Sequence, residues 1–186
     1  MIKKHRITTK EIVLTAVFSA VTIVLSQLAV PLPTGVPVTL QTFAVALCGY
    51  VLGWRSGLCA IGVYVILGLA GLPVFSNFTG GAGVLFGVTG GFIFGFLGMV
   101  ALCGIFRKQK NPAVRLALGF AGLAVCHIAG TIQFSLVTKN PLLTSFLTAS
   151  APYLVKDVIS VASAYFVSLA VNKGLAAARF TGYAAN

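Results

Sequence analysis

Acidic side chains are almost absent from this sequence, in which Glu11 and Asp157 are the only carboxylate residues among 186. Charged residues of both signs make up 8% of the chain, against about 25% in soluble globular domains. Hydrophobic residues account for 58%. Such a chain cannot surround a core with charged side chains, so the composition excludes a soluble domain. Its length is that of one domain, and we expect a single transmembrane domain over residues 1–186.

The residue sets needed for catalysis and for metal binding are missing as well. The sequence has two histidines, no CxxC pair, no paired acids, no GxSxG and no phosphate-loop pattern. An enzyme is therefore the least supported class, and we expect no catalytic residue, no metal and no cofactor. The four cysteines lie in apolar stretches and are interpreted as buried thiols. His127 is interpreted as a hydrogen-bonded packing residue, because no carboxylate pattern surrounds it.

Positive charge is abundant, with a formal net charge of +11, but its distribution argues against nucleic-acid binding. The basic residues cluster at the ends of apolar stretches and are not interleaved with aromatic residues. Such clusters mark the cytoplasmic ends of membrane helices. An N-terminus in the cytoplasm leaves Lys139 in an outer loop and Lys156 within the membrane. It places the other eleven on the cytoplasmic side: Lys3, Lys4, Arg6, Lys10, Arg55, Arg107, Lys108, Lys110, Arg115, Lys173 and Arg179.

Six apolar segments are predicted as membrane helices, although the second and third are shorter than the about 20 residues that a straight crossing needs. They are expected at about 11–30, 38–52, 58–69, 84–106, 114–137 and 153–172. The predicted fold is an all-α six-transmembrane-helix bundle with both termini in the cytoplasm. Residues 1–10 form its basic N-terminal segment, and the first helix is interpreted as retained, because no convincing signal-peptide cleavage site follows it.

Glycine and proline positions predict several local features of this bundle. Gly83, Gly87, Gly91 and Gly95 recur every four residues, which predicts one closely packed face along the fourth helix. A ligand against the bare backbone near Gly80 to Gly83 is the alternative. Residues 53–57 are predicted as a tight turn. The uncharged loops 31–37 and 71–83 fall on the outer side and favour ligand access from there. For the sixth helix, Ser150 is the expected N-cap and Pro152 is expected in the first turn.

Lys156 and Asp157 are neighbours inside the last apolar stretch, near the outer end of the sixth helix. Ionisable residues within a membrane cost free energy and usually belong to a functional site. We therefore predict a polar ligand site here, with a salt-bridged packing pair as the alternative. Thr39, Gln41 and Asn77 offer hydroxyl and amide groups at the same depth. Singly they are typical of helix or turn caps, whereas together with the charged pair they extend the predicted site.

Several stretches resemble the BioY family, the biotin-specific substrate-binding (S) components of energy-coupling factor (ECF) transporters. They are Gly35-Val36-Pro37-Val38-Thr39-Leu40-Gln41-Thr42-Phe43, Gly71-Leu72-Pro73-Val74-Phe75 with Gly80-Gly81, Thr89-Gly90-Gly91, and Pro152 to Asp157. The chain departs from the family pattern at residues 87–92, where GVTGGF replaces GPTGGY. It also has Ser160 where the family has a lysine, and Lys156 lies one turn earlier on the same helix face.

The resemblance implies a biotin site. Asp157 is expected to accept a hydrogen bond from a ureido N–H of biotin, and Lys156 to donate to the ureido oxygen or to the tail carboxylate. The other expected ligand contacts are Asn77, Gln41, Tyr153, Phe75, Gly80, Gly81 and Thr39. Ala16 and Ala20 resemble the small-residue face that S components present to their transmembrane coupling (T) subunit.

The resemblance also implies that the chain lies in the cell membrane of a prokaryote and works with the T subunit and two ATPase subunits. It would bind biotin and leave ATP hydrolysis to those partners. Two alternatives remain open, namely an S component for another small vitamin and a structural or channel-like helical bundle that binds no ligand.

Overall fold

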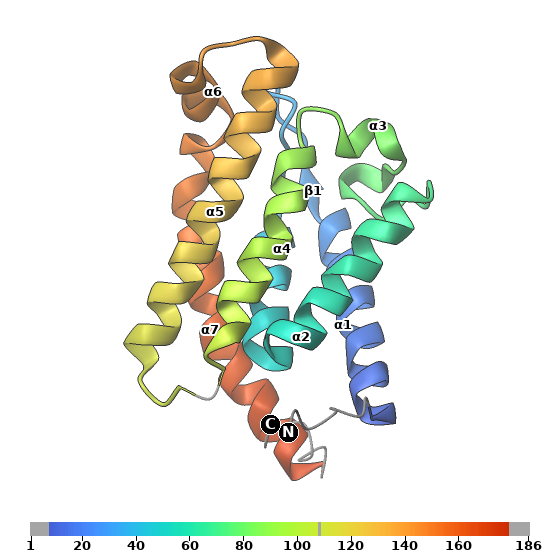
Figure 1. Cartoon of the computed structure of the whole chain (residues 1–186), viewed down its shortest axis with the longest axis vertical. Helices are drawn as coiled ribbons and strands as arrows, with labels where there is room; N and C mark the ends of the chain where they lie inside the picture. Colours follow the sequence, from blue (N-terminus) through green and yellow to red (C-terminus); the bar gives the residue numbers. More distant parts are fainter. Residues whose placement is uncertain (1–7, 108, 179–186) are drawn as a thin grey trace, which may run out of the picture.

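The computed structural model describes residues 8–107 and 109–178, which are mostly helical (Figure 1). The two short strands pair as an antiparallel hairpin, with Ala29 opposite Thr39. The prediction of a helical bundle is confirmed, with this hairpin added to it. The elements are α1 (Thr9–Gln27), β1 (Ala29–Val30), β2 (Val38–Thr39), α2 (Gln41–Leu69), η1 (Ser76–Phe78), α3 (Ala82–Leu85), α4 (Gly90–Ile105), α5 (Pro112–Thr138), α6 (Leu142–Ala149), η2 (Ala151–Tyr153) and α7 (Leu154–Ala177).

Within the described residues, four helical stretches are long and apolar enough to cross a membrane. These stretches are Thr9–Gln27, Gln41–Leu69, Pro112–Thr138 and Leu142–Ala177. The apolar helix α4 is shorter, with 16 residues. Helix α2 contacts α1, α4 and α7, and its Tyr50 and Tyr64 are fully buried. The chain is thus a helical membrane protein built around α2.

Helix α2 reverses direction at Gly53, so that its two halves lie beside each other. Gly53 has φ 76° and ψ 173°, a conformation that essentially only glycine adopts. Cys48 Sγ lies 3.9 Å from the carbonyl oxygen of Gly57, whereas residues nine apart in a continuous helix are about 13 Å apart. The predicted tight turn is confirmed but is shorter than expected, because the helix resumes at Trp54.

The predicted fourth helix is broken between α3 and α4, so the prediction of one continuous glycine face is wrong. Gln133 on α5 holds the break, because its Nε2 donates to the carbonyl oxygens of Leu85 and Gly87 at 2.7 and 2.8 Å. These bonds tie the segment between α3 and α4 to α5, and they give the Leu85 carbonyl a partner in place of the missing helical turn. Within α4 itself, Gly95 packs so closely on α5 that a Cβ atom would lie 2.7 Å from the α5 backbone.

The last apolar stretch folds as α6, a single 3-10 turn η2, and α7. Pro152 lies in the η2 turn, just before α7 begins. A proline fits there because the first turn of a helix does not use the N–H that proline lacks. Ser150 makes no capping hydrogen bond, and its hydroxyl is instead paired with that of Thr131 at 2.8 Å. Ser150 therefore holds the predicted N-cap position, at the start of η2, but its side chain does not cap the turn, because Thr131 on the neighbouring helix α5 engages it.

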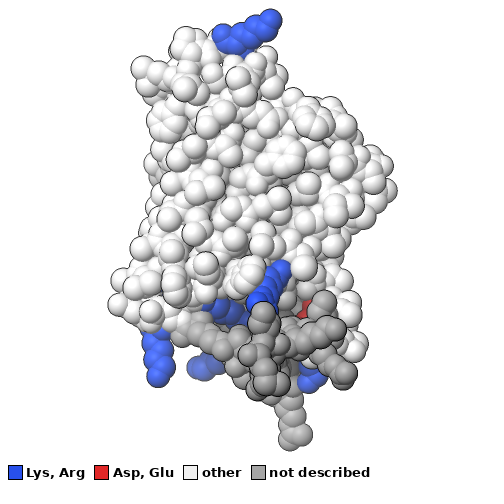
Figure 2. Space-filling view, in the orientation of Figure 1, with Lys and Arg blue, Asp and Glu red and all other residues white. Residues whose placement is uncertain are grey.

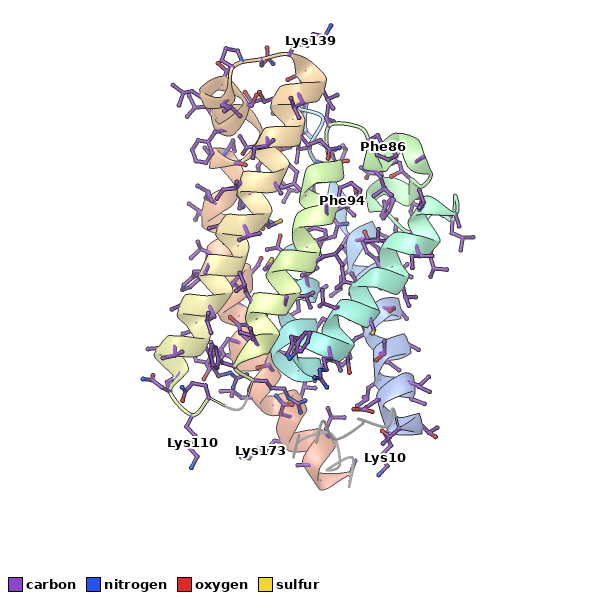
Figure 3. All side chains as sticks on the ribbon, in the orientation of Figure 1. Lys10, Phe86, Phe94, Lys110, Lys139 and Lys173 are labelled. Carbon is purple, nitrogen blue, oxygen red and sulfur yellow. The ribbon has the colours of Figure 1, made fainter. Side chains whose placement is uncertain are left out.

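Basic side chains gather at the end of the molecule where α1 begins and α7 ends (Figure 2). Lys10, Lys110 and Lys173 project from that end, whereas Lys139 lies at the opposite end with α6 (Figure 3). This separation agrees with the predicted grouping for these four residues. The predicted basic residues that lie outside the described part of the chain are Lys3, Lys4, Arg6, Lys108 and Arg179.

Candidate functional site

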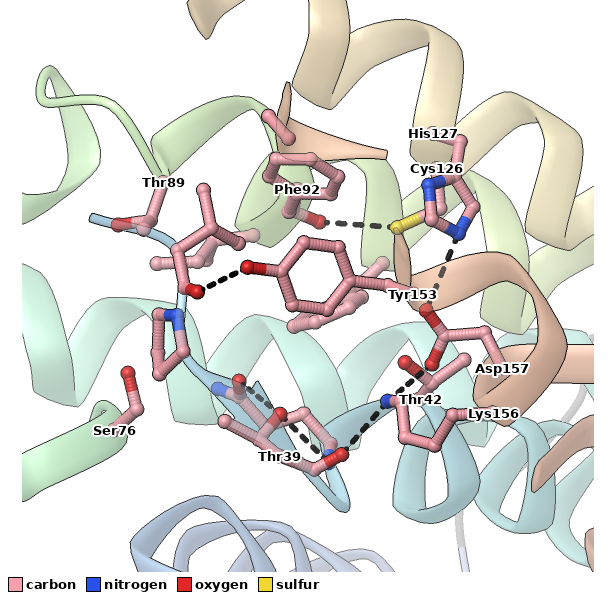
Figure 4. A pocket seen from close by; sticks show the side chains of 16 residues that line it. Thr39, Thr42, Ser76, Thr89, Phe92, Cys126, His127, Tyr153, Lys156 and Asp157 are labelled. Atoms are coloured by element: carbon pink, nitrogen blue, oxygen red, sulfur yellow. Dashed lines mark hydrogen bonds and ion pairs between the residues drawn. The ribbon is translucent and has the colours of Figure 1, made fainter. Parts of the chain in front are cut away.

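A pocket lies where the β1–β2 hairpin, the starts of α2, α4 and α7, and the middle of α5 meet (Figure 4). Its free volume is about 50 Å³, which is below the about 300–1,000 Å³ of typical small-molecule sites. A vitamin-sized ligand therefore requires the surrounding segments to move apart. The lining residues are Val36, Pro37, Thr39, Gln41, Thr42, Ser76, Thr89, Phe92, Ile93, Phe96, Cys126, His127, Ala149, Tyr153, Lys156 and Asp157.

The carboxylate of Asp157 lies in the pocket wall, and each of its oxygens faces a basic side chain. The amino group of Lys156 pairs with Oδ1, and Nε2 of His127 lies 3.3 Å from Oδ2. The Asp157 side chain is only 7% exposed. A buried carboxylate without partners is strongly destabilising. The contacts with Lys156 and His127 therefore allow Asp157 to carry a negative charge at this position.

Lys156 links this carboxylate to the hairpin. Its amino group donates a hydrogen bond to the backbone carbonyl oxygen of Thr39 at 2.9 Å, in addition to its contact with Asp157. An ammonium group has three N–H donors, and the Lys156 side chain is 29% exposed. One donor is therefore left for a ligand on the pocket side.

Thr39 and Gln41 belong to a polar network at the start of α2. The Thr39 hydroxyl donates to Gln41 Oε1 at 2.9 Å, and Gln41 Nε2 donates to the Tyr64 hydroxyl at 2.6 Å. Both residues are buried and line the pocket. Their side chains hold one another in place, which presents a fixed polar wall to whatever occupies the pocket.

Tyr153 connects the start of α7 to the tip of the hairpin. Its hydroxyl donates to the carbonyl oxygen of Val36 at 2.5 Å and lies 2.8 Å from the hydroxyl of Thr34. The ring itself forms part of the pocket wall (Figure 4). Tyr153 thus contributes apolar surface to the pocket and at the same time closes the hairpin over it.

Four of the predicted ligand contacts lie outside the pocket lining, namely Phe75, Asn77, Gly80 and Gly81. Phe75 is buried against Tyr64, with ring centroids 5.3 Å apart in an edge-to-face arrangement. Asn77 is exposed and has a positive φ of 56°. In this conformation Phe75 is a core residue and Asn77 a turn residue, and Ser76 between them lines the pocket in their place.

Several pocket residues were not predicted from the sequence, and His127 is the most informative. The expectation that no carboxylate surrounds it is wrong, because Asp157 comes from a helix 30 residues further along the chain. The sequence contained one usable signal. It places a histidine within one predicted membrane helix and the single intramembrane carboxylate, Asp157, within another. The other unpredicted lining residues include Thr42, Thr89, Phe92, Ile93, Phe96 and Cys126.

Ala16 and Ala20 lie outside the pocket lining, on an exposed side of α1. Their neighbours on this helix, Ile12, Val13 and Val17, are exposed hydrophobic residues. These five residues recur at helical spacing, so they form one exposed apolar surface on α1. Such a surface suits contact with lipid or with another helix.

The arrangement suits binding and offers few means for catalysis. No cluster of His, Cys, Asp and Glu that could hold a metal ion occurs within residues 8–107 and 109–178. The pocket combines one anionic acceptor at Asp157, a cationic donor at Lys156 and an apolar wall that includes Phe92, Ile93 and Phe96. A compact ligand with N–H donors, a carbonyl acceptor and apolar rings would satisfy these groups together.

Comparison with known proteins points to one family. The sequence model described as the BioY family matches residues 1–177. The "Biotin transporter BioY" of Thermotoga maritima is 36% identical over 165 residues, which cover 88% of this chain and 96% of that protein. The "Probable biotin transporter BioY" of Pyrococcus horikoshii is 36% identical over 160 residues, covering 86% of this chain and 94% of that protein.

The fold is also similar to that of a solved structure. A crystal structure of the S-component for biotin from an ECF-type ABC transporter superimposes with a TM-score of 0.83 and 26% sequence identity. The match covers 90% of this chain and 95% of that chain. The likeness therefore extends over most of the fold.

Proposed function

This chain belongs to the BioY family, and from that premise we propose that it is the high-affinity biotin-binding membrane subunit of an ECF-type uptake transporter. The proposal treats residues 1–186 as a single transmembrane domain. Support for biotin as the ligand comes from the relatives and the solved S component described above, which are named for biotin. The observation that carries it is the buried Asp157, held between Lys156 and His127 at the wall of a largely apolar pocket.

Biotin matches the chemistry of this pocket. Its ureido ring has two N–H donors and one carbonyl oxygen, and the rest of its bicyclic core is apolar. Asp157 would accept one ureido N–H, and the free donor of Lys156 would bind the ureido oxygen. Thr39 and Gln41 would complete the polar contacts, while Tyr153 covers the rings. Asn77, Phe75, Gly80 and Gly81 would approach the ligand only if the 71–83 loop moves.

We propose a topology in which the chain crosses the cell membrane of a prokaryote six times. The crossings would be α1, the two halves of α2, α4, α5 and α7, with the basic end in the cytoplasm. The position of Lys139 at the opposite end supports this orientation, because short cytoplasmic loops are enriched in Lys and Arg. The pocket would then open toward the external side, where biotin is captured.

Energy for transport would come from partner subunits. The exposed Ala16 and Ala20 face of α1 is the proposed contact with the T subunit, and two ATPase subunits would hydrolyse ATP. This chain would bind biotin without taking part in hydrolysis.

A biotin titration of the purified protein in lipid nanodiscs tests the proposal. We expect binding tighter than about 1 µM, and a loss of affinity of about 10- to 100-fold in Asp157→Asn, because the ureido N–H then meets a neutral amide in place of a carboxylate. Glu11→Gln is the matched control, since Gln preserves the capping box with Thr8. Equal affinity for thiamine or riboflavin would point to a different vitamin. Unchanged biotin binding in a folded Asp157→Asn variant would support a packing role for the charged pair.

A further inference from the structure

His127 has a second ring nitrogen that the structure leaves without a partner. Its Nε2 faces Asp157 Oδ2 at 3.3 Å, whereas Nδ1 is buried and makes no hydrogen bond. The whole side chain is 7% exposed. Buried polar atoms are nearly always hydrogen-bonded, so this atom is an exception that requires an explanation.

The contact with Asp157 determines what Nδ1 can do. An ionised carboxylate only accepts hydrogen bonds, so the Nε2 atom that faces it carries the proton. In a neutral imidazole the other nitrogen is then a bare acceptor. The ring plane is also held, because Phe92 packs edge-to-face against it with centroids 5.9 Å apart at 87°. His127 thus holds an oriented, unused acceptor beside the pocket that both rings line.

We propose that His127 is a specificity-determining residue whose Nδ1 accepts a hydrogen bond from the second N–H of the ligand. This inference rests on the proposed function, because a cyclic urea presents two N–H donors. Asp157 accepts one N–H, His127 accepts the other, and Lys156 donates to the carbonyl between them. Through Nε2, the same histidine also orients Asp157. The site then selects for two N–H groups flanking one carbonyl, and penalises a ligand that lacks either N–H.

Two substitutions separate the roles of the two ring nitrogens. In His127→Gln the side-chain amide reaches about as far as Nε2 and keeps a donor for Asp157, while no acceptor remains at the Nδ1 position. In His127→Phe both nitrogens are lost and the ring volume is kept. The probe ligands are biotin and its two derivatives methylated at one or the other ureido nitrogen, since each derivative lacks one N–H.

The experiment measures the affinity of all three ligands for wild type, His127→Gln and His127→Phe in nanodiscs, with thermal unfolding to verify folding. In wild type we expect both methylated ligands to bind more weakly than biotin. In His127→Gln we expect biotin affinity to fall about tenfold, and one of the two methylated ligands to bind as well as biotin. Asp157→Asn should weaken discrimination against the other methylated ligand, because an amide oxygen is a poorer acceptor than a carboxylate, and this assigns one N–H to each acceptor.

Two results would overturn the inference while the proposed function stands. The first is biotin binding by His127→Gln equal to that of wild type. The second is an equal loss for all three ligands, with discrimination intact, which would reduce His127 to a positioning residue for Asp157. A wild-type protein that does not bind biotin would instead remove the proposed function itself. If His127→Phe does not fold, His127→Gln decides the question, because Gln keeps the contact with Asp157.

Discussion

The amino group of Lys156 on α7 donates a hydrogen bond to the carbonyl oxygen of Thr39 on β2 at 2.9 Å, across 117 residues of the chain. The same group neutralises Asp157, its neighbour in sequence. One side chain therefore holds the hairpin, the first turn of α7 and the buried carboxylate together. Any ligand that pairs with Lys156 also meets the two segments that enclose the pocket.

Replacement of Lys156 by Met should weaken biotin binding. The methionine keeps much of the apolar stem but removes the donor to the ligand and leaves Asp157 with His127 as its one basic partner in the pocket. We expect a loss of about 10- to 100-fold in affinity, measured by titration in nanodiscs. Lys173→Met, at the exposed basic end, is the control and should bind as wild type. Equal affinity in the two variants would contradict a ligand role for Lys156.

Replacement of Tyr153 by Phe should loosen the hairpin over the pocket. The variant loses the hydrogen bond to Val36 and the contact with Thr34 while the ring remains. We expect faster amide hydrogen exchange in residues 31–39 and biotin dissociation faster by about five- to tenfold. Tyr165→Phe, which alters a tyrosine outside the pocket lining, should change neither quantity. A hairpin that exchanges at the wild-type rate in Tyr153→Phe would show that other contacts hold it.

The sequence predicted the helical segments well because their signal is local. A run of apolar residues by itself indicates burial or membrane insertion. Gly53 by itself indicates a turn, because glycine can adopt backbone angles that other residues avoid. The break before α4 was missed because Gln133, which binds the Leu85 and Gly87 carbonyl groups there, comes from α5. Gln133 is distant in the sequence, so its contact cannot be predicted from the local pattern of residues 84–106.

The candidate site likewise has features that the local sequence predicts and features that depend on helix packing. Lys156 and Asp157 are predicted from the sequence alone, because charged residues inside an apolar stretch are rare and usually functional. The contact between His127 and Asp157 was missed because it depends on how α5 and α7 pack. Asn77 is predicted at the site from its amide group, but in the structure it is exposed, has a positive φ and lies outside the pocket lining. Residue type thus predicted a charged pair that lines the pocket, and helix packing determines which other residues lie beside it.

Glycine at position 95 should be essential for the packing of α4 on α5. A Cβ atom there would lie 2.7 Å from Cys126 Cα, so Gly95→Ala should lower the free energy of unfolding by about 1–3 kcal/mol. Gly83→Ala is the matched control, because a Cβ atom at Gly83 meets nothing within 4 Å. Thermal unfolding in detergent compares the two variants. Equal unfolding midpoints would mean that α4 and α5 can separate without loss of stability.

Arg115 is a buried cation that two aromatic rings enclose at the basic end of the bundle. Its guanidinium carbon lies 5.6 Å from the ring centroid of Tyr50 and 5.0 Å from that of Tyr165. Its Nη2 also donates to the Tyr50 carbonyl oxygen at 3.4 Å, and the residue is 8% exposed. Cation–π contacts contribute most when they are desolvated, up to about 2 kcal/mol. Arg115 therefore joins α5 to α2 and α7 at the end of the molecule away from the pocket.

Replacement of Arg115 by Lys should destabilise the protein and leave biotin affinity unchanged. A lysine keeps the charge, but its ammonium cannot stack on a ring as a planar guanidinium does. We expect the free energy of unfolding to fall by about 1–2 kcal/mol, which lowers the thermal unfolding midpoint by about 2–8 °C for a chain of this size. Arg55→Lys is the control, because Arg55 stacks on Trp54 at a similar distance of 5.0 Å but is exposed, and exposed contacts contribute little. Equal shifts in the two variants would show that burial of Arg115 adds nothing to its contact with the tyrosines, and a loss of biotin affinity in Arg115→Lys would show that the basic end communicates with the pocket.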